Sequence, residues 1–197
     1  MKKRPPVTAG DLVDKLRSDP ELVARAKERD RVLQERTVKH CAEEAPLLAE
    51  LREVGENLES VWDLVNTRRR YERAVPVLLN HLLKPYSERI REGIARALAV
   101  SDARYAWPVL VEEYCRLSDR KPRNEVKDGL ALARSATATE AVIDALIALA
   151  KDRSHGDSRL LLLRALKRSK NPAAKQALDE LASDPDLAKE IASWKRR

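Results

Sequence analysis

Apolar residues recur at helical spacing along most of the chain from Asn57 onward, and Asn57 itself is a candidate N-cap for a short helix. Eight further helical segments are predicted after it, and they follow one another in pairs. Asn171-Pro172 and Asp184-Pro185 each place a capping residue before a proline, which is typical of a helix start. The predicted pairs are 71–83 with 87–100, 103–118 with 123–136, 137–151 with 157–170, and 171–183 with 184–197.

The N-terminal part of the chain has a more polar pattern. A short helix over residues 11–17 and a long helix over residues 20–44 are predicted, and the apolar stripe of the long helix is thin, which favours a solvated helix over a coiled coil. Pro46 disfavours helical geometry at Ala45, so a break or kink is expected there before the helix resumes. The sequence therefore predicts two domains, an N-terminal helical segment (residues 1–56) and a repeat domain (residues 57–197).

The helix pairs resemble one another in sequence. Pro76 and Pro108 occupy the same position in the first helices, and an internal proline costs about 3 kcal/mol, so a shared kink is predicted. Gly93 and Gly129 coincide in the second helices, where a glycine indicates the close approach of a neighbouring backbone. Stacking of such pairs would give a continuous core. The aligned segments are 74–79, 106–111, 141–146 and 173–178 in the first helices, and 90–94 and 126–130 in the second.

These features resemble HEAT-type α-helical repeats over about residues 71–194. The resemblance rests on the two prolines and on the second-helix pattern Ser87-x-x-Ile90-Arg91-x-x-Ile94-x-x-Ala97-Leu98. It implies an all-α fold, a right-handed α-solenoid of helix pairs with an N-terminal helical extension. It also implies that Arg91 bridges neighbouring repeats, whereas Lys127 at the matching position lacks the planar guanidinium. The apolar run 160–163 leaves the register of the third pair open.

Composition agrees with a helical protein and narrows its setting. The 197 residues include 39 Lys and Arg against 32 Asp and Glu, a net charge of +7, with 36% charged residues, five glycines and no phenylalanine. Cys41 and Cys115 form no paired motif, and the basic start of the chain is followed by no apolar segment. The longest apolar run, Leu160–Leu163, is far too short to span a membrane. A soluble, reduced, cytoplasmic protein is expected.

Candidate chemistry is sparse in the sequence. The three histidines are far apart and the glycines are isolated, so we expect no metal site, no cofactor and no enzymatic activity. Alkylpurine DNA glycosylases with HEAT-like repeats resemble this fold class, and they use aromatic and acidic residues on a basic surface. Trp107 with Glu112 and Glu113 offers such a group, but Trp107 aligns with the core-like Val75, which favours a place in the core.

Charge is divided between the two kinds of helix. On the predicted boundaries the second helices are net basic and the first helices net acidic, and second helices commonly line the inner side of a solenoid. The residues expected to face this inner side form the candidate binding surface. They are Arg89, Glu92, Arg96, Glu125, Asp128, Leu132, Leu161 and Arg164.

The mixed character of this surface favours a protein partner with an acidic or mixed surface, because Glu92, Glu125 and Asp128 would repel a phosphate backbone. Stand-alone HEAT-like proteins of this size resemble adaptors and toxin-neutralising immunity proteins, and the segment 62–65 is similar to that group. The basic net charge disfavours a nuclease toxin as partner. Nucleic-acid binding, including a DNA glycosylase-like role, is the alternative. A hydrolase is a third hypothesis, for which the sequence offers no candidate catalytic residue, and ordinary solvated helix faces without a partner are the simplest interpretation of the surface.

Overall fold

The computed structural model describes residues 10, 19–117 and 124–195, and every regular element in that part of the chain is a helix, as predicted. The helix expected over residues 11–17 lies outside the described residues. Contacts divide the chain into two compact units, residues 1–43 and residues 44–197. This division falls inside the helix α2 (Pro20–Glu53), whereas the sequence pattern placed the domain boundary after residue 56.

In the first unit, the described part of α2 is polar and exposed. Leu33 and Val38 leave 52% and 70% of their surface accessible. Arg31 forms ion pairs with Glu28 at 2.7 Å and with Glu35 at 3.2 Å. Ion pairs one turn apart stabilise a helix that has little packing of its own, so this segment is a solvated helix.

In the second unit, α2 continues through Pro46, and the predicted break before it is wrong. The proline removes one helical hydrogen bond, but the turns on both sides of it are anchored. Leu47 and Leu51 are fully buried, and the Glu44 carboxylate accepts the backbone N–H of Val61 at 2.6 Å. These tertiary contacts outweigh the local preference of the proline.

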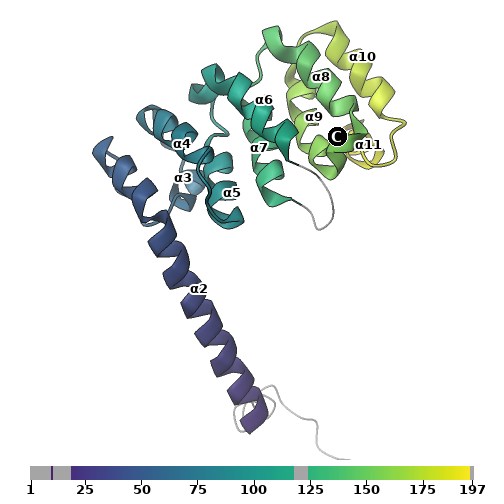
Figure 1. The fold of residues 1–197 in the computed structure, drawn as a ribbon. Helices are drawn as coiled ribbons and strands as arrows, with labels where there is room; N and C mark the ends of the chain where they lie inside the picture. The colour runs from purple at the N-terminus through teal and green to yellow at the C-terminus, as the bar shows by residue number, and fades with distance from the viewer. Residues whose placement is uncertain (1–9, 11–18, 118–123, 196–197) are drawn as a thin grey trace, which may run out of the picture. The chain divides into compact units, whose positions relative to one another are not determined.

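The rest of the second unit consists of short helices (Figure 1). Several of them directly follow a 3-10 turn. The predicted pairs agree with these helices to within a few residues. In chain order they are α3 (Trp62–Asn66), η1 (Glu72–Ala74) with α4 (Val75–Leu82), α5 (Glu88–Ala97), η2 (Ser101–Ala106) with α6 (Trp107–Arg116), α7 (Glu125–Thr137), η3 (Glu140–Val142) with α8 (Ile143–Lys151), η4 (Arg153–Ser158), α9 (Arg159–Arg168), α10 (Pro172–Leu181) and α11 (Ala188–Lys195).

The equivalent prolines of the first helices lie at a junction and not inside an α-helix, where a kink was predicted. Pro76 and Pro108 lie in the first turn of α4 and α6, directly after the 3-10 turns η1 and η2. A proline is tolerated there because its missing N–H has no intrahelical acceptor in the first turn. The third pair repeats the junction between η3 and α8 with Asp144 in place of the proline.

The structure also settles the register of the first helix in the third pair. α4, α6 and α8 begin at Val75, Trp107 and Ile143, and these three residues are buried. The positions three residues later, Leu78, Leu110 and Leu146, are fully buried as well. The alignment of residues 141–146 with 106–111 is therefore wrong by one residue, because burial follows the start of each α-helix.

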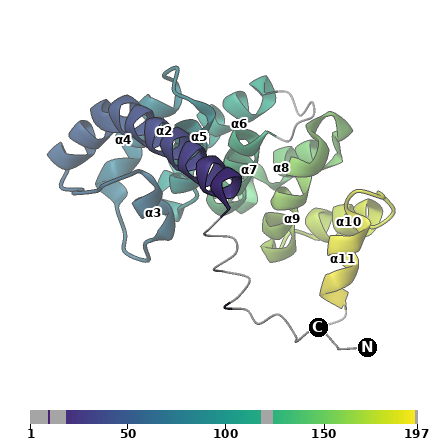
Figure 2. The ribbon, with the colours of Figure 1, turned by 90° about the horizontal axis from the view of Figure 1, so that it is seen from below.

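The second helices α5, α7 and α9 lie side by side in that order (Figures 1 and 2). Glycine permits part of this packing. A Cβ at Gly129 of α7 would lie 3.2 Å from the backbone oxygen of Glu92 in α5, so the predicted close backbone approach is confirmed there. A Cβ at Gly93 would lie 2.6 Å from the Cγ1 atom of Val61, a side-chain contact with the segment that opens α3.

Candidate binding groove

One alignment relates the three second helices and shows which of their side chains are equivalent. Buried residues recur with the same spacing when α7 is shifted by 36 residues from α5, and α9 by 32 from α7. Arg159 of α9 is thereby equivalent to Arg91 of α5. The equivalent buried sets are Ile90, Ile94, Ala97 and Leu98 in α5, Val126, Leu130, Ala133 and Arg134 in α7, and Ser158, Leu162, Ala165 and Leu166 at α9.

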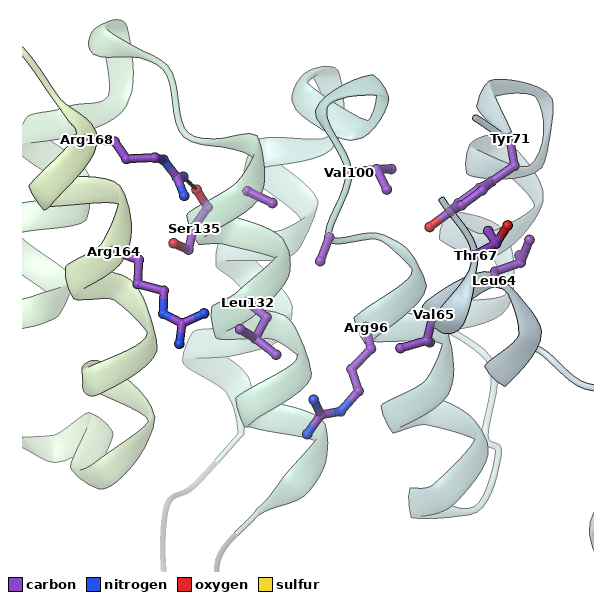
Figure 3. A pocket seen from close by; sticks show the side chains of 12 residues that line it. Leu64, Val65, Thr67, Tyr71, Arg96, Val100, Leu132, Ser135, Arg164 and Arg168 are labelled. Atoms are coloured by element: carbon purple, nitrogen blue, oxygen red, sulfur yellow. Dashed lines mark hydrogen bonds between the residues drawn. The ribbon is translucent and has the colours of Figure 1, made fainter. Parts of the chain in front are cut away.

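The same register aligns three predicted surface residues, and they line one groove. Arg96, Leu132 and Arg164 are equivalent residues of α5, α7 and α9, and all three face a pocket of about 360 Å³ (Figure 3). One turn further along, Val100, Ala136 and Arg168 line it too. We call this the arginine groove. Its remaining lining residues are Leu64, Val65, Thr67, Tyr71, Ala99 and Ser135.

In the arginine groove, Leu132 of α7 lies between the arginines of α5 and those of α9. Arg96 of α5 donates to Glu92 at 2.6 Å and is partly neutralised by it. Arg168 of α9 donates to the backbone oxygen of Ser135 at 2.6 Å. Arg164 forms no hydrogen bond or ion pair with any residue that the structure describes. No Asp or Glu side chain is among the lining residues, so the groove presents positive charge.

Two of the predicted surface residues are buried. Glu92 exposes 7% of its surface and Asp128 3%, so their assignment to the exposed inner face is wrong. The prediction assumed that each second helix buries one face. In the structure α5 packs against α3, α4 and α7, and α7 packs against α5, α6 and α9, which covers the positions next to the expected face.

The other predicted residues lie outside the groove lining. Arg89 and Glu125 are exposed near the N-terminal ends of α5 and α7. Arg89 lies over the ring of Trp62, with its Cζ atom 5.2 Å from the ring centroid. Leu161 is half-buried and is equivalent to Gly129, a packing position. Of these three, Leu161 was expected on the binding surface because the register of the third pair was open, whereas Arg89 and Glu125 were placed there by helical rotation.

The sequence reasoning missed part of the groove. Arg168 is absent from the predicted binding surface, although its spacing of four residues from Arg164 puts both on one helix face. Val65 and Thr67 belong to the α3 segment, and no helical periodicity relates them to the second helices. Only the packing of α3 against α5 brings them to the groove.

Outside the groove, the other candidates for chemistry are parts of the packed structure. His81 is fully buried, and its Nδ1 lies 2.7 Å from the hydroxyl of Tyr86. Its Nε2 lies 2.9 Å from Glu50, and this hydrogen bond is the main reason that the pKa of the Glu50 carboxyl is lowered. Trp107 belongs to the core, as its alignment with Val75 predicted. Among the described residues, no three His, Cys, Asp or Glu side chains come together as a metal site would require.

The described helices include none with the length and apolar character needed to cross a membrane. Comparisons of the chain with family models, with curated proteins and with solved structures found no match.

Proposed function

We propose that residues 71–194 form a HEAT-like right-handed solenoid. The common register of α5, α7 and α9 supports this proposal, and so do two ion pairs between successive helix pairs. Arg91 of α5 lies 3.3 Å from Glu113 of α6, and its equivalent Arg159 lies 3.0 Å from Asp184, which precedes α11. In HEAT-type repeats an arginine at this position is expected to bridge neighbouring repeats.

The proposed function is non-catalytic binding of a protein partner, through an acidic segment that enters the arginine groove. The observation that carries this proposal is the groove itself, with guanidinium groups on α5 and α9, no lining carboxylate, and Leu132 of α7 between them. Arginine is well suited to binding carboxylates at interfaces. An acidic segment with an apolar residue between its charges complements such a groove, and an adaptor or an immunity-type protein would use it in this way.

The apolar centre favours a protein over nucleic acid. Packed helices lie about 8–10 Å apart, so Arg96 and Arg164 stand on helices about 16–20 Å apart, with Leu132 at the equivalent position between them. A phosphate backbone is bound by a succession of cations, and this row is interrupted. Repulsion of a phosphate backbone by Glu92 and Asp128 is weaker than the sequence indicated, because both residues are buried.

Selection from a random twelve-residue peptide library displayed on phage would test this function. The wild type should enrich sequences with Asp or Glu flanking Leu, Ile or Val, and Arg164→Glu should abolish the enrichment. Lys175→Glu is the matched control, because Lys175 is exposed on α10 outside the groove and the variant changes net charge equally. No enrichment with the wild type, or equal enrichment with Arg164→Glu, would refute the proposal.

A fluorescently labelled 20-base-pair duplex tests the alternative. Binding to phosphates weakens steeply as salt rises. If the duplex binds in the low-micromolar range at physiological salt and Arg164→Glu abolishes that binding while Lys175→Glu does not, the groove is a nucleic-acid site and the protein-partner proposal fails.

A further inference from the structure

Positive charge is distributed unevenly within the arginine groove. At the α5 end, the guanidinium of Arg96 is held at 2.6 Å by the carboxylate of Glu92, so the pair has no net charge. At the α9 end, Arg164 and Arg168 have no acidic partner among the described residues. Arg168 contacts the backbone oxygen of Ser135, which leaves its charge uncompensated. The groove therefore has a doubly cationic end on α9 and a nearly neutral end on α5.

The two arginines of α9 are placed to act on one ligand group. They are four residues apart on one face of the helix, and side chains so spaced are neighbours. Both extend from α9 toward α7 (Figure 3). Each guanidinium carries five N–H donors in a planar fork that matches the oxygens of a carboxylate or a phosphate. Arg164 has this whole set available, and Arg168 has most of it.

The surroundings of this end are also basic. Lys167 borders a neighbouring pocket of about 450 Å³ together with Arg164 and Arg168, and its Nζ lies 4.5 Å from the ring centroid of Trp194. Glu190 lines that neighbouring pocket, and it accepts a hydrogen bond from the indole N–H of Trp194 at 3.2 Å. The carboxylate of Glu140, in a third pocket beside Arg168, accepts hydrogen bonds from Ser169 and from the backbone of Lys170. Neither acid lines the arginine groove.

We infer, building on the proposed function, that the α9 end of the groove binds a phosphorylated side chain of the partner peptide, held between Arg164 and Arg168. A phosphate monoester carries about −1.5 to −2 charges at pH 7 in one compact group. Two guanidinium groups neutralise that charge. The carboxylate of a single Asp or Glu carries only one negative charge, which is about half as much. The Arg96–Glu92 pair has no net charge and offers no comparable site for a phosphate, so the peptide binds in one direction.

The groove also sets the spacing within the peptide. Leu132 and Ala136 of α7 lie one helix spacing from α9, about 8–10 Å. An extended peptide advances about 3.3 Å per residue. An apolar side chain two or three residues from the phosphorylated residue would therefore lie over α7.

The test uses three pools of degenerate eleven-residue peptides that are identical except for a central phosphoserine, glutamate or serine. The full-length protein is immobilised, and the retained peptides are quantified and sequenced. We expect the phosphoserine pool to be retained at least tenfold over the serine pool and severalfold over the glutamate pool. Retained phosphopeptides should carry Leu, Ile or Val two or three residues from the phosphoserine.

Variants then locate the effect. Arg164→Gln should remove most of the preference for phosphoserine over glutamate, whereas Arg96→Gln should weaken all pools alike and Lys175→Gln should change nothing. Arg164 is the informative site because it supports no described contact, so its loss leaves the fold intact, which circular dichroism checks. Equal retention of the phosphoserine and glutamate pools, both lost with Arg164→Glu, would overturn this inference and leave the proposed function standing. Retention of no pool would overturn both.

A 5′-phosphorylated oligothymidylate serves as the competing source of the same chemical group. If it displaces the phosphopeptides and its own binding depends on Arg164 in the same way, the phosphate site belongs to a nucleic-acid end and the inference is wrong. If the oligonucleotide does not displace the phosphopeptides but a free phosphoserine peptide does, the result supports a phosphorylated peptide as the ligand.

Discussion

Arg134 of α7 offers a direct test of the packing described above. It is fully buried, and none of its three side-chain nitrogens has a hydrogen-bond partner within the described part of the chain. Its guanidinium lies between two aromatic rings, 5.1 Å from the centroid of Trp107 and 4.5 Å from that of Tyr114. The equivalent residues of α5 and α9 are Leu98 and Leu166. An arginine therefore stands in a core position that leucine fills elsewhere.

The structure allows the cost of this arginine to be worked out. Burial lowers the pKa of Arg134 from 12.5 to about 10. At 1.36 kcal/mol for each pH unit, keeping the side chain charged costs the folded state about 3 kcal/mol. Cation–π attraction between the guanidinium and the two rings offsets about 2 kcal/mol of this cost. Because Arg134→Met removes both the cost and the offset and keeps an unbranched side chain, it should raise the free energy of unfolding by about 1 kcal/mol.

Urea titration of wild type and Arg134→Met, followed by far-ultraviolet circular dichroism and by tryptophan fluorescence, measures the difference. A thermal midpoint higher by about 2–4 °C is expected for a chain of this size. Arg134→Lys is the matched control, because it keeps a buried charge and should give no gain. If Arg134→Met instead loses 1 kcal/mol or more while both probes report one transition, the aromatic contacts outweigh the burial cost and the reasoning is wrong.

Three further predictions test other parts of the molecule. Gly93→Leu should lower the free energy of unfolding by about 1–3 kcal/mol or more, because even a Cβ there would lie 2.6 Å from a neighbouring methyl group; an unchanged urea midpoint would contradict this. Arg159 holds the pKa of the Asp184 carboxyl below its ordinary value, so their pairing stabilises the fold above about pH 4 and is lost as the pH falls toward that lowered value. Asp184→Asn should therefore lower the thermal midpoint at neutral pH and flatten its fall in acid, and two parallel curves would exclude this role. A chain of residues 44–197 should melt cooperatively with its helicity intact, whereas residues 57–197, which lack two fully buried leucines of α2, should melt at lower temperature or aggregate; equal melting of the two would show that α2 adds nothing to the core.

Helix positions were predictable because the signals for them are local. Caps, prolines and the period of apolar residues lie within each segment, and they placed the helices of the second unit to within a few residues. A break at Pro46 was one of the two outcomes predicted there, and it is absent because Leu47 and Leu51 are buried in the second unit and the helix continues. Contacts of that kind come from residues distant in the sequence, and no local pattern reports them.

The groove was predictable only in part, for a similar reason. Helical rotation placed Arg96, Leu132 and Arg164 on one face, and these residues line the groove. The same rotation placed Glu92 and Asp128 there, although both are buried against neighbouring helices. A rotation argument gives the angle between side chains on one helix. It does not give the number of neighbours, which decides how wide the exposed face is.

The character of the groove and the weak point of the core follow from one local difference in α7. In that helix Leu132 faces the groove, and Arg134 is buried. The equivalent residues are Arg96 and Leu98 in α5, and Arg164 and Leu166 in α9. Relative to its neighbours, α7 thus has the leucine and the arginine exchanged. With an arginine at position 132, the second helices would present an unbroken row of cations, the arrangement that a phosphate backbone needs. With a leucine at position 134, the core would lack the buried guanidinium of Arg134. This exchange is expected to lower the stability of the core, and it gives the groove its apolar centre. Such a loss of stability is expected at the binding surface proposed above, because residues of a binding surface serve recognition and not packing.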